Sequence, residues 1–385
     1  MASLTFLTPP RIICEPGALS QLGVLAAELG GSKALIVTDP GLVSLGYGDD
    51  ALTALNHAGV NGQIFDKVEA DPPYRVVTEA TEAAKEFDAD IIIGLGGGSS
   101  IDTAKVVALA ARSDQTLDQM VGTDQATGTR LPLMAVPTTA GTGSEVTFVS
   151  VLTSDEGYKR AIYTPRILPD IAVLDPELTL DMPPHVTAAP ALDAMVHAIE
   201  AYTSRTRKNP ISDALAVKAL DMLCKSFKTV LSDGRNLQAR TDMLLGSTLA
   251  GMAFINASVG AVHALSYPLG SRFHVPHGHS NALVMGAVFR FNISAAQKEY
   301  AELARVVLSE QDFSDDAAAA EAFVNYLENL LAESGLETRM SSLGVKDEDI
   351  PSMAREVTQQ ITRLIATNPK DMDFDEVCTL YRSVL

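Results

Sequence analysis

The sequence contains few cysteines, and they lie far apart. Cys14, Cys224 and Cys378 are odd in number and form no C-x-x-C pair. This spacing argues against a disulfide framework and against a thiolate zinc site. The sequence also lacks a run of about 18 or more apolar residues, and no basic region followed by a long apolar stretch opens it. We therefore expect a cytoplasmic protein that neither spans a membrane nor carries a secretion signal.

Positively charged residues are scarce as well. Lysines and arginines number 29 against 48 aspartates and glutamates, so the formal net charge is −19. Because the basic residues are scattered, a polyanion would be repelled over most of the surface. We expect no nucleic-acid partner and look instead for a small-molecule substrate.

What the chain does contain is enough apolar material for two domains. It has 385 residues, of which 46% are hydrophobic. In the first half, short β-branched runs alternate with stretches of helical spacing, which predicts a parallel sheet covered on both faces. The expected strands are 33–39, 63–68, 90–96 and 131–139, and the expected helices are 17–30, 50–59, 74–87 and 100–112.

The second half of the chain has a different pattern. Residues 147–175 still contain strand-like runs, but these signals stop at the proline pair 183–184. Helical spacing then dominates in 191–204, 211–231, 237–255, 295–309 and 316–335. We expect a Rossmann-like α/β domain over residues 1–181 and an all-helical domain over residues 182–385.

Two polar loops follow predicted strands. The first, GLGGGSSIDTAK from Gly94 to Lys105, joins an apolar strand to a helix, with Asp102 expected in the first helical turn. Such a turn lets backbone N–H groups converge on a phosphate. The second, PTTAGTGSE from Pro137 to Glu145, can hydrogen-bond a diphosphate or a ribose. Ligands of open α/β sheets bind where such loops meet, so we predict a dinucleotide site.

Asp39 ends another predicted strand. A carboxylate at this position accepts hydrogen bonds from ribose hydroxyls and repels a 2′-phosphate, which favours NAD over NADP. Asp39 is also a good helix N-cap before Pro40, and the two roles are compatible.

Histidines concentrate in the helical half. Asp193 and His197 lie at i and i+4 in an apolar stretch, so they share one helix face that must be buried. With His263 and His277 they make an N3O donor set, which suits Fe²⁺, Zn²⁺ or another late divalent metal. His274 and His279 flank His277, and for both we favour exposure to water over lining the cavity.

The four motifs GGGSSIDTAK, PTTAGTGSE, DAMVHAIEAY and HALSYPLG followed by PHG match, in order and spacing, those of a known family. The chain resembles the iron-containing (group III) alcohol dehydrogenases over essentially its whole length. The resemblance implies a dehydroquinate synthase-like architecture, with an NAD-binding α/β domain and a metal- and substrate-binding helical domain. It also implies a homo-oligomer, a dimer or larger, that interconverts alcohols with aldehydes or ketones using NAD and Fe²⁺, with Zn²⁺ as an alternative.

Residue by residue, the resemblance implies that the metal ligands are Asp193, His197, His263 and His277. The resemblance also implies which residues bind the cofactor: Asp39, Gly96, Gly97, Gly98, Ser99, Asp102, Thr138, Thr139, Thr142 and Lys159. The alternative for Lys159 is an ordinary surface lysine. Phe254 is expected to line the substrate pocket, or else to be plain core.

Two positions depart from the commonest family pattern. Tyr267 stands where the best-known members have a second histidine, so it marks a branch and is our candidate for a proton relay, or else packs at the wall of the site. Pro190 stands in APALD before the first ligand, where we expect it to open the helix at its first turn.

Four other enzymes and one non-enzyme remain as alternatives. The enzymes are a dehydroquinate synthase-like lyase, a zinc-dependent glycerol dehydrogenase-like enzyme, a hydroxyacid-oxoacid transhydrogenase-like enzyme and a metal-free maleylacetate reductase-like enzyme. The non-enzyme is an NAD-binding sensor on a dead scaffold. Retention of the ligand set and of the glycine turn favours the metal-dependent dehydrogenase.

Overall fold

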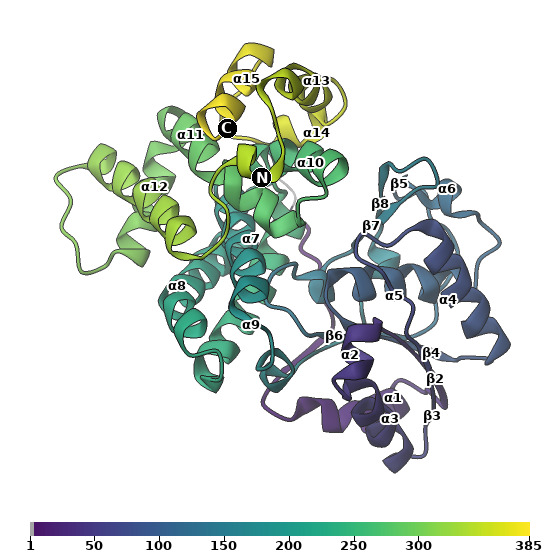
Figure 1. Ribbon diagram of the computed structural model, residues 1–385. Coiled ribbons are helices and arrows are strands. Elements are labelled where there is room, and N and C mark those ends of the chain that lie inside the picture. The colour runs from purple at the N-terminus through teal and green to yellow at the C-terminus, as the bar shows by residue number, and fades with distance from the viewer. Residues whose placement is uncertain (1–3) are drawn as a thin grey trace. The chain divides into compact units, whose positions relative to one another are not determined.

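The chain divides into two compact units in a computed structural model that describes residues 4–385 (Figure 1). One unit comprises Leu7–Asp181. The other comprises Met182–Leu385 together with residues 4–6 of the described chain. Each unit has its own secondary-structure composition and is described separately.

The first unit is built on a parallel sheet. In the part of the chain that the structure describes, six strands form this sheet in the order β3-β2-β4-β6-β9-β1. The predicted parallel α/β fold is therefore confirmed. The strands are β1 (Arg11–Cys14), β2 (Lys33–Val37), β3 (Asn61–Phe65), β4 (Ile91–Gly96), β6 (Leu133–Pro137) and β9 (Ile171–Leu174).

Helices cover both faces of this sheet because its strands are apolar on both sides (Figure 1). Alternate residues face opposite layers: Leu35 packs in one core cluster with α4 and α5, and Ile36 packs in the other with α1 and α3. The helices of the unit are α1 (Leu22–Glu28), α2 (Pro40–Ser44), α3 (Tyr47–His57), α4 (Tyr74–Glu86), α5 (Gly98–Ala110) and α6 (Leu117–Met120).

Two features of the first unit were not predicted. The edge strand β1 is four residues long and pairs with β9, so its partner is about 160 residues away in sequence. The polar strand-like stretch after residue 147 separates into two parts. β7 (Val149–Thr153) and β8 (Lys159–Tyr163) form a second sheet with β5 (Gly122–Thr123), whereas β9 joins the main sheet.

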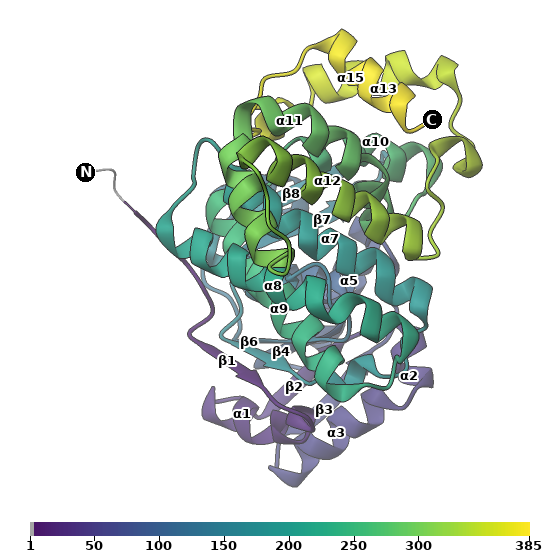
Figure 2. The same cartoon turned by 90° about the vertical axis from the view of Figure 1, so that its left-hand side faces the viewer.

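The second unit is helical throughout its named elements, apart from short turns of 3₁₀ helix, as expected. Figures 1 and 2 show α7 surrounded by α8, α9 and α11, which all pack against it. The helices are α7 (Pro184–Thr203), α8 (Pro210–Ser232), α9 (Leu237–Ala257), α10 (Ala261–Phe273), α11 (His277–Val307), α12 (Asp316–Glu333), α13 (Ile350–Gln359), α14 (Thr362–Ile365) and α15 (Phe374–Ser383).

The predicted start of the helix that carries Asp193 is wrong. Helix α7 begins at Pro184, after Pro183 as its N-cap, so Pro190 lies inside the helix and not in its first turn. Pro184 takes the first helical position, where a proline costs no hydrogen bond. Pro190 itself lacks the N–H that would otherwise bond to the carbonyl one turn earlier.

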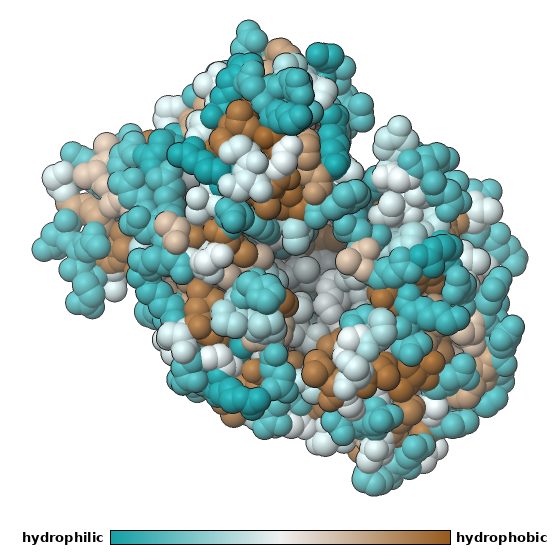
Figure 3. Space-filling model, in the orientation of Figure 1, coloured by the Kyte–Doolittle hydropathy of each residue, from teal (hydrophilic) through white to brown (hydrophobic). Residues whose placement is uncertain are grey.

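No single helix among residues 4–385 has the length and apolar composition of a membrane span. Within the described range, one pair of helices, α9 and α10, meets those criteria when taken together, and the two are bent by 105° to each other. On the face shown in Figure 3, hydrophilic residues are spread over both units, with apolar residues in several patches among them.

Candidate metal centre and cofactor loops

The glycine turn joins β4 to α5 in the first unit. Gly96 ends β4 with φ +148°, a conformation that favours glycine. A Cβ at Gly96 would lie 2.6 Å from the Ser100 hydroxyl oxygen. Gly97 is the N-cap and α5 begins at Gly98, so the free N–H groups of this first turn are at the end of a buried strand. That is the backbone arrangement which binds phosphate.

The second loop lies directly beside the glycine turn. Strand β6 pairs with β4 so that Pro137 is opposite Gly96, and the Thr138 N–H donates to the Gly96 carbonyl at 3.1 Å. A Cβ on Gly98 would be 2.9 Å from the Thr142 methyl carbon, and one on Gly97 would be 3.6 Å from Thr139. The two predicted loops are therefore neighbours, and the absence of side chains on the glycines makes their close approach feasible.

Asp39 lies at the same edge of the sheet. It follows β2, which pairs with β4. The chain leaves β2 toward β3 on one side and continues through β4, β6 and β9 on the other, so the sheet changes winding direction between β2 and β4. Ligands of open α/β sheets bind outside the carboxyl ends at such a point. Asp39 is also the N-cap of α2 and accepts from the Leu42 N–H at 3.1 Å.

Asp102 lies in the second turn of α5, not in its first, because the helix begins at Gly98. Its carboxylate accepts from the Ser144 hydroxyl at 2.5 Å and from the Val151 N–H at 2.8 Å. Asp102 thus connects α5 to the second loop and to β7.

Lys105 completes this connection one helical turn further on. Its side chain is fully buried, and its ammonium donates to the Ser144 hydroxyl at 2.7 Å, the Thr147 hydroxyl at 2.9 Å and the Val149 carbonyl at 2.8 Å. Burial lowers the pKa of Lys105, and the nearby Asp102 carboxylate opposes that shift. The ammonium fixes the second loop against α5.

Two further predicted cofactor residues, Ser99 and Lys159, lie in different parts of the first unit. Ser99 lies in the first turn of α5, where its carbonyl accepts from Thr103 at 2.8 Å. Lys159 opens β8 in the second sheet and forms an ion pair with Asp71. A contact between Lys159 and the cofactor stays a prediction.

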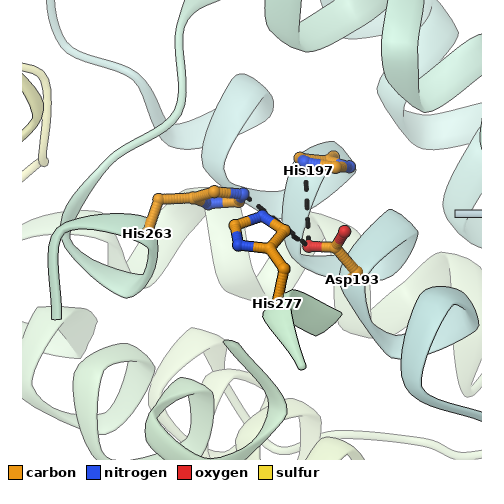
Figure 4. A group of neighbouring side chains, drawn as sticks. All are labelled: Asp193, His197, His263 and His277. Carbon is orange, nitrogen blue, oxygen red and sulfur yellow. Dashed lines mark ion pairs between the residues drawn. The ribbon is translucent and has the colours of Figure 1, made fainter. Parts of the chain in front are cut away.

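The helical unit brings the four predicted ligands together (Figure 4). Helix α7 supplies Asp193 and His197 from one face, α10 supplies His263, and α11 supplies His277, its first residue. Asp193 Oδ1 lies 3.7 Å from Nε2 of His197, 3.7 Å from Nε2 of His263 and 3.8 Å from Nε2 of His277. One ligand atom from each residue lies within 4.8 Å of the others.

This geometry fits a divalent metal ion. Donors about 2.0–2.2 Å from one ion in a tetrahedron are about 3.3–3.6 Å apart. The three distances from Asp193 Oδ1 are close to this range at 3.7–3.8 Å, and all donor atoms lie within 4.8 Å of one another. The set has three imidazole nitrogens and one carboxylate oxygen, which suits iron or zinc better than magnesium or calcium. Asp193, His197 and His263 are buried, whereas the His277 side chain is 44% exposed. The cluster therefore has one solvent-facing side.

Neighbouring groups shift the pKa values of two members of this cluster. Burial by itself would raise the pKa of Asp193, but the three imidazoles and the Asn281 amide together hold that pKa below its usual value. Burial would likewise lower the pKa of His263, yet the nearby Glu200 carboxylate raises it. A buried anion among imidazole nitrogens is a favourable site for a metal cation.

Two residues of the site were missed by sequence reasoning. Asn281 follows His277 by one helical turn, and its amide nitrogen donates to Asp193 Oδ1 at 2.6 Å and lies 3.2 Å from Nε2 of both His263 and His277. Glu200 accepts from Nδ1 of His263 at 2.7 Å. Both were detectable as polar residues one turn after a ligand: Asn281 at i+4 from His277 and Glu200 at i+3 from His197.

The other predicted residues surround the cluster or lie apart from it. The Phe254 ring stacks on His197 with centroids 4.3 Å apart, and the Tyr267 ring is 6.3 Å from that of His277. The expectation that His279 faces water is wrong: it is buried, and its ring contacts the Glu337 carbonyl at 2.7 Å. His274 is exposed at the end of α10 with φ 54°. Neither spare histidine joins the four ligands.

The folds of both units and the four-residue cluster correspond to the class of oxidoreductase that the motifs resemble. A family model described as "Iron-containing alcohol dehydrogenase" matches residues 9–176. A second, "Fe-containing alcohol dehydrogenase family, C-terminal", matches residues 187–385. The chain belongs to the iron-containing alcohol dehydrogenase family.

Individual relatives show the same extent of similarity. Long-chain-alcohol dehydrogenase 1 of Geobacillus thermodenitrificans is 36% identical over 389 residues, which cover 100% of this chain and 97% of that protein. The crystal structure of a 1,3-propanediol oxidoreductase has a TM-score of 0.96 and 35% identity, with 100% of both chains covered. Sulfoacetaldehyde reductase from Bifidobacterium kashiwanohense in complex with NAD⁺ has a TM-score of 0.90 and 28% identity, covering 100% of this chain and 99% of that chain.

Proposed function

We propose that the chain is an NAD-dependent, divalent-metal alcohol dehydrogenase that also reduces aldehydes or ketones. Hydride passes between the carbinol carbon of a small-molecule substrate and C4 of the nicotinamide. The observation that carries this proposal is the buried Asp193 carboxylate with three imidazole nitrogens 3.7–3.8 Å from it. Family membership supports the reaction class.

Residues 7–181 are proposed to bind the cofactor. The first turn of α5, at Gly97, Gly98 and Ser99, offers N–H groups to the diphosphate. Thr138, Thr139 and Thr142 approach the cofactor from the adjacent loop. Asp39 accepts from the adenosine ribose, which favours NAD over NADP. A relative solved with NAD⁺ supports this assignment.

Residues 182–385 are proposed to bind the metal and the substrate. Asp193, His197, His263 and His277 would hold Fe²⁺, with Zn²⁺ as the alternative. When bound, the metal supplies a Lewis acid that lowers the pKa of the alcohol as hydride leaves for the nicotinamide. The exposed side of His277 leaves a route by which a substrate oxygen reaches the site.

Two aromatic residues are proposed to serve the substrate. Phe254 stacks on His197 and would form an apolar wall of the substrate site. Tyr267 places a hydroxyl-bearing ring beside His277 and would pass a proton along a hydrogen-bonded chain. Tyr267 in place of a second histidine would put the chain in a distinct branch of the family. We further propose that the enzyme is a cytoplasmic homo-oligomer.

The test is metal content together with NADH formation on a panel of short alcohols and diols, using protein purified without oxygen. The wild type is expected to hold stoichiometric iron or zinc, and His277→Ala should lose both metal and activity. His274→Asn is the matched control, since His274 is exposed and asparagine tolerates its left-handed backbone.

Two results would contradict the proposal. Activity in a wild type that contains no metal would mean that the four ligands are misassigned and that the chain acts like the metal-free reductases. Bound NAD without turnover of any alcohol or aldehyde on the panel would instead support a sensor.

A further inference from the structure

Glu200 is a buried acid that the proposed reaction does not use. It lies on α7 one turn after His197, and only 5% of its surface is exposed. A carboxylate at such a position destabilises the fold unless both oxygens have strong partners. Its partners therefore indicate what it does.

Both carboxylate oxygens of Glu200 are engaged by α10. Oε2 is 2.7 Å from Nδ1 of His263, and Oε1 accepts from the backbone N–H of Val262 at 2.7 Å. A Cβ at Gly260, just before α10, would lie 3.2 Å from Oε1, a tight contact, so the glycine leaves room for the carboxylate there. The two hydrogen bonds and this close backbone approach fix the carboxylate plane.

The contact with His263 determines which ring nitrogen carries a proton. An ionised carboxylate only accepts, so Nδ1 must be the donor. The lone pair available to a metal is then on Nε2, the atom that lies 3.7 Å from Asp193 Oδ1. Carboxylates that hold metal-binding histidines in this way are a general device of metal sites.

We propose that Glu200 is a positioning residue for the metal: it holds His263 in the Nδ1-protonated tautomer with Nε2 directed at Asp193, His197 and His277. This inference rests on the proposed function, because it takes His263 to be a ligand. Glu200 itself does not touch the metal or the substrate.

Glu200→Gln is the informative substitution because it preserves size and removes one acceptor. A glutamine side chain has one oxygen and one NH₂ group, whereas Val262 and His263 both donate. If the amide oxygen faces Val262, its NH₂ faces Nδ1 and favours the tautomer with a proton on Nε2. If the amide oxygen faces His263, the glutamine NH₂ group faces the backbone N–H of Val262, so two donors are opposed. Either arrangement weakens metal binding.

The experiment measures the Kd of the full-length, metal-free protein for Co²⁺ and Zn²⁺ by competition with a chromophoric chelator. Loss of a carboxylate that orients a metal-binding histidine weakens metal binding about 10–100-fold, and this is the increase in Kd expected for Glu200→Gln. The control is Glu302→Gln, which removes a carboxylate that accepts from the Tyr202 hydroxyl at 2.6 Å. Its Kd should equal that of the wild type.

A second measurement does not depend on any variant folding. In the Zn²⁺-loaded wild type with ¹⁵N-labelled histidines, NMR is expected to show Nδ1 of His263 protonated and Nε2 bound to the metal. Coordination through Nδ1, or a Kd for Glu200→Gln within twofold of the wild type, would overturn the positioning role. If the wild type binds neither Co²⁺ nor Zn²⁺, it is the proposed function that fails, because His263 is then no ligand, and the inference falls with it.

Discussion

Gly278 of α11 lies against the backbone of α7, and it is next to His277, a predicted metal ligand. A Cβ built on Gly278 would lie 2.5 Å from the carbonyl oxygen of Ala189, 2.7 Å from the carbonyl carbon of Ala189 and 3.2 Å from the nitrogen of Pro190. These are backbone atoms, so no side chain can rotate away. Ordinary contacts between non-bonded heavy atoms need about 3.5 Å, so Gly278→Ala must shift one helix against the other by close to 1 Å.

The expected loss of stability follows from this overlap. Overpacking of this kind costs about 1–3 kcal/mol. In a unit of roughly 200 residues, each kcal/mol corresponds to about 2–4 °C in Tm, so Gly278→Ala should lower Tm by about 2–12 °C. The same shift moves His277 away from Asp193 and His197, both on α7, so metal affinity should fall as well.

Gly270→Ala provides the matched control. A Cβ at Gly270, inside α10, would meet only the Val275 carbonyl oxygen, at 3.6 Å. Alanine in a helix is favoured over glycine by up to about 1 kcal/mol, so this variant should match or exceed the wild type in Tm. Calorimetry and chelator competition measure both quantities. A Gly278→Ala protein with unchanged Tm and unchanged metal affinity would refute the packing argument.

Four further predictions follow from the two sites. Lys105→Met should lower the free energy of unfolding in urea by about 1–3 kcal/mol, since it leaves the Ser144 and Thr147 hydroxyls and the Val149 carbonyl without their donor; an unchanged free energy contradicts this role. Asp39→Ser keeps an N-cap but removes a charge, so kcat/KM with NADP should rise relative to NAD, and an unchanged ratio counts against the ribose contact. Tyr267→Phe should lower kcat by up to about 10²-fold and change its pH profile, whereas an identical profile eliminates the relay. In the metal-free protein, the raised pKa of His263 stabilises the fold: the contribution is complete below about pH 6.5 and is lost as pH rises through the raised pKa. His263→Gln should therefore reduce the pH dependence of the free energy of unfolding, measured in urea.

Sequence patterns identified the elements whose signals are local. β-branched runs between helical stretches predicted four strands of the parallel sheet, because strand and helix spacing are visible within about ten residues. The edge strand β1 was not predicted because four residues give too short a pattern, and its pairing with Ile171–Leu174 is long-range. The start of α7 was misplaced because Pro184 and Pro190 are equally compatible with a first helical turn.

Only part of the predicted ligand set can be derived from local spacing in the sequence. Asp193 and His197 are linked by one helical turn, so their shared direction can be read from spacing alone. His277 and His279 cannot be separated in this way until the beginning of α11 is known. With His277 as its first residue, His279 is two positions on, about 200° around the helix, and therefore points to Glu337 and away from the cluster.

The sequence by itself determined the fold class, the glycine turn after β4 and the chemistry of the four predicted donors, since residue type and short spacing carry that information. Only the tertiary structure decided what supports those groups. Glu200 contacts His263 across 63 positions, and Lys105 reaches Val149 across 44. A buried charge must find partners wherever the packed chain places them, and no local pattern records which distant backbone or ring nitrogen that is.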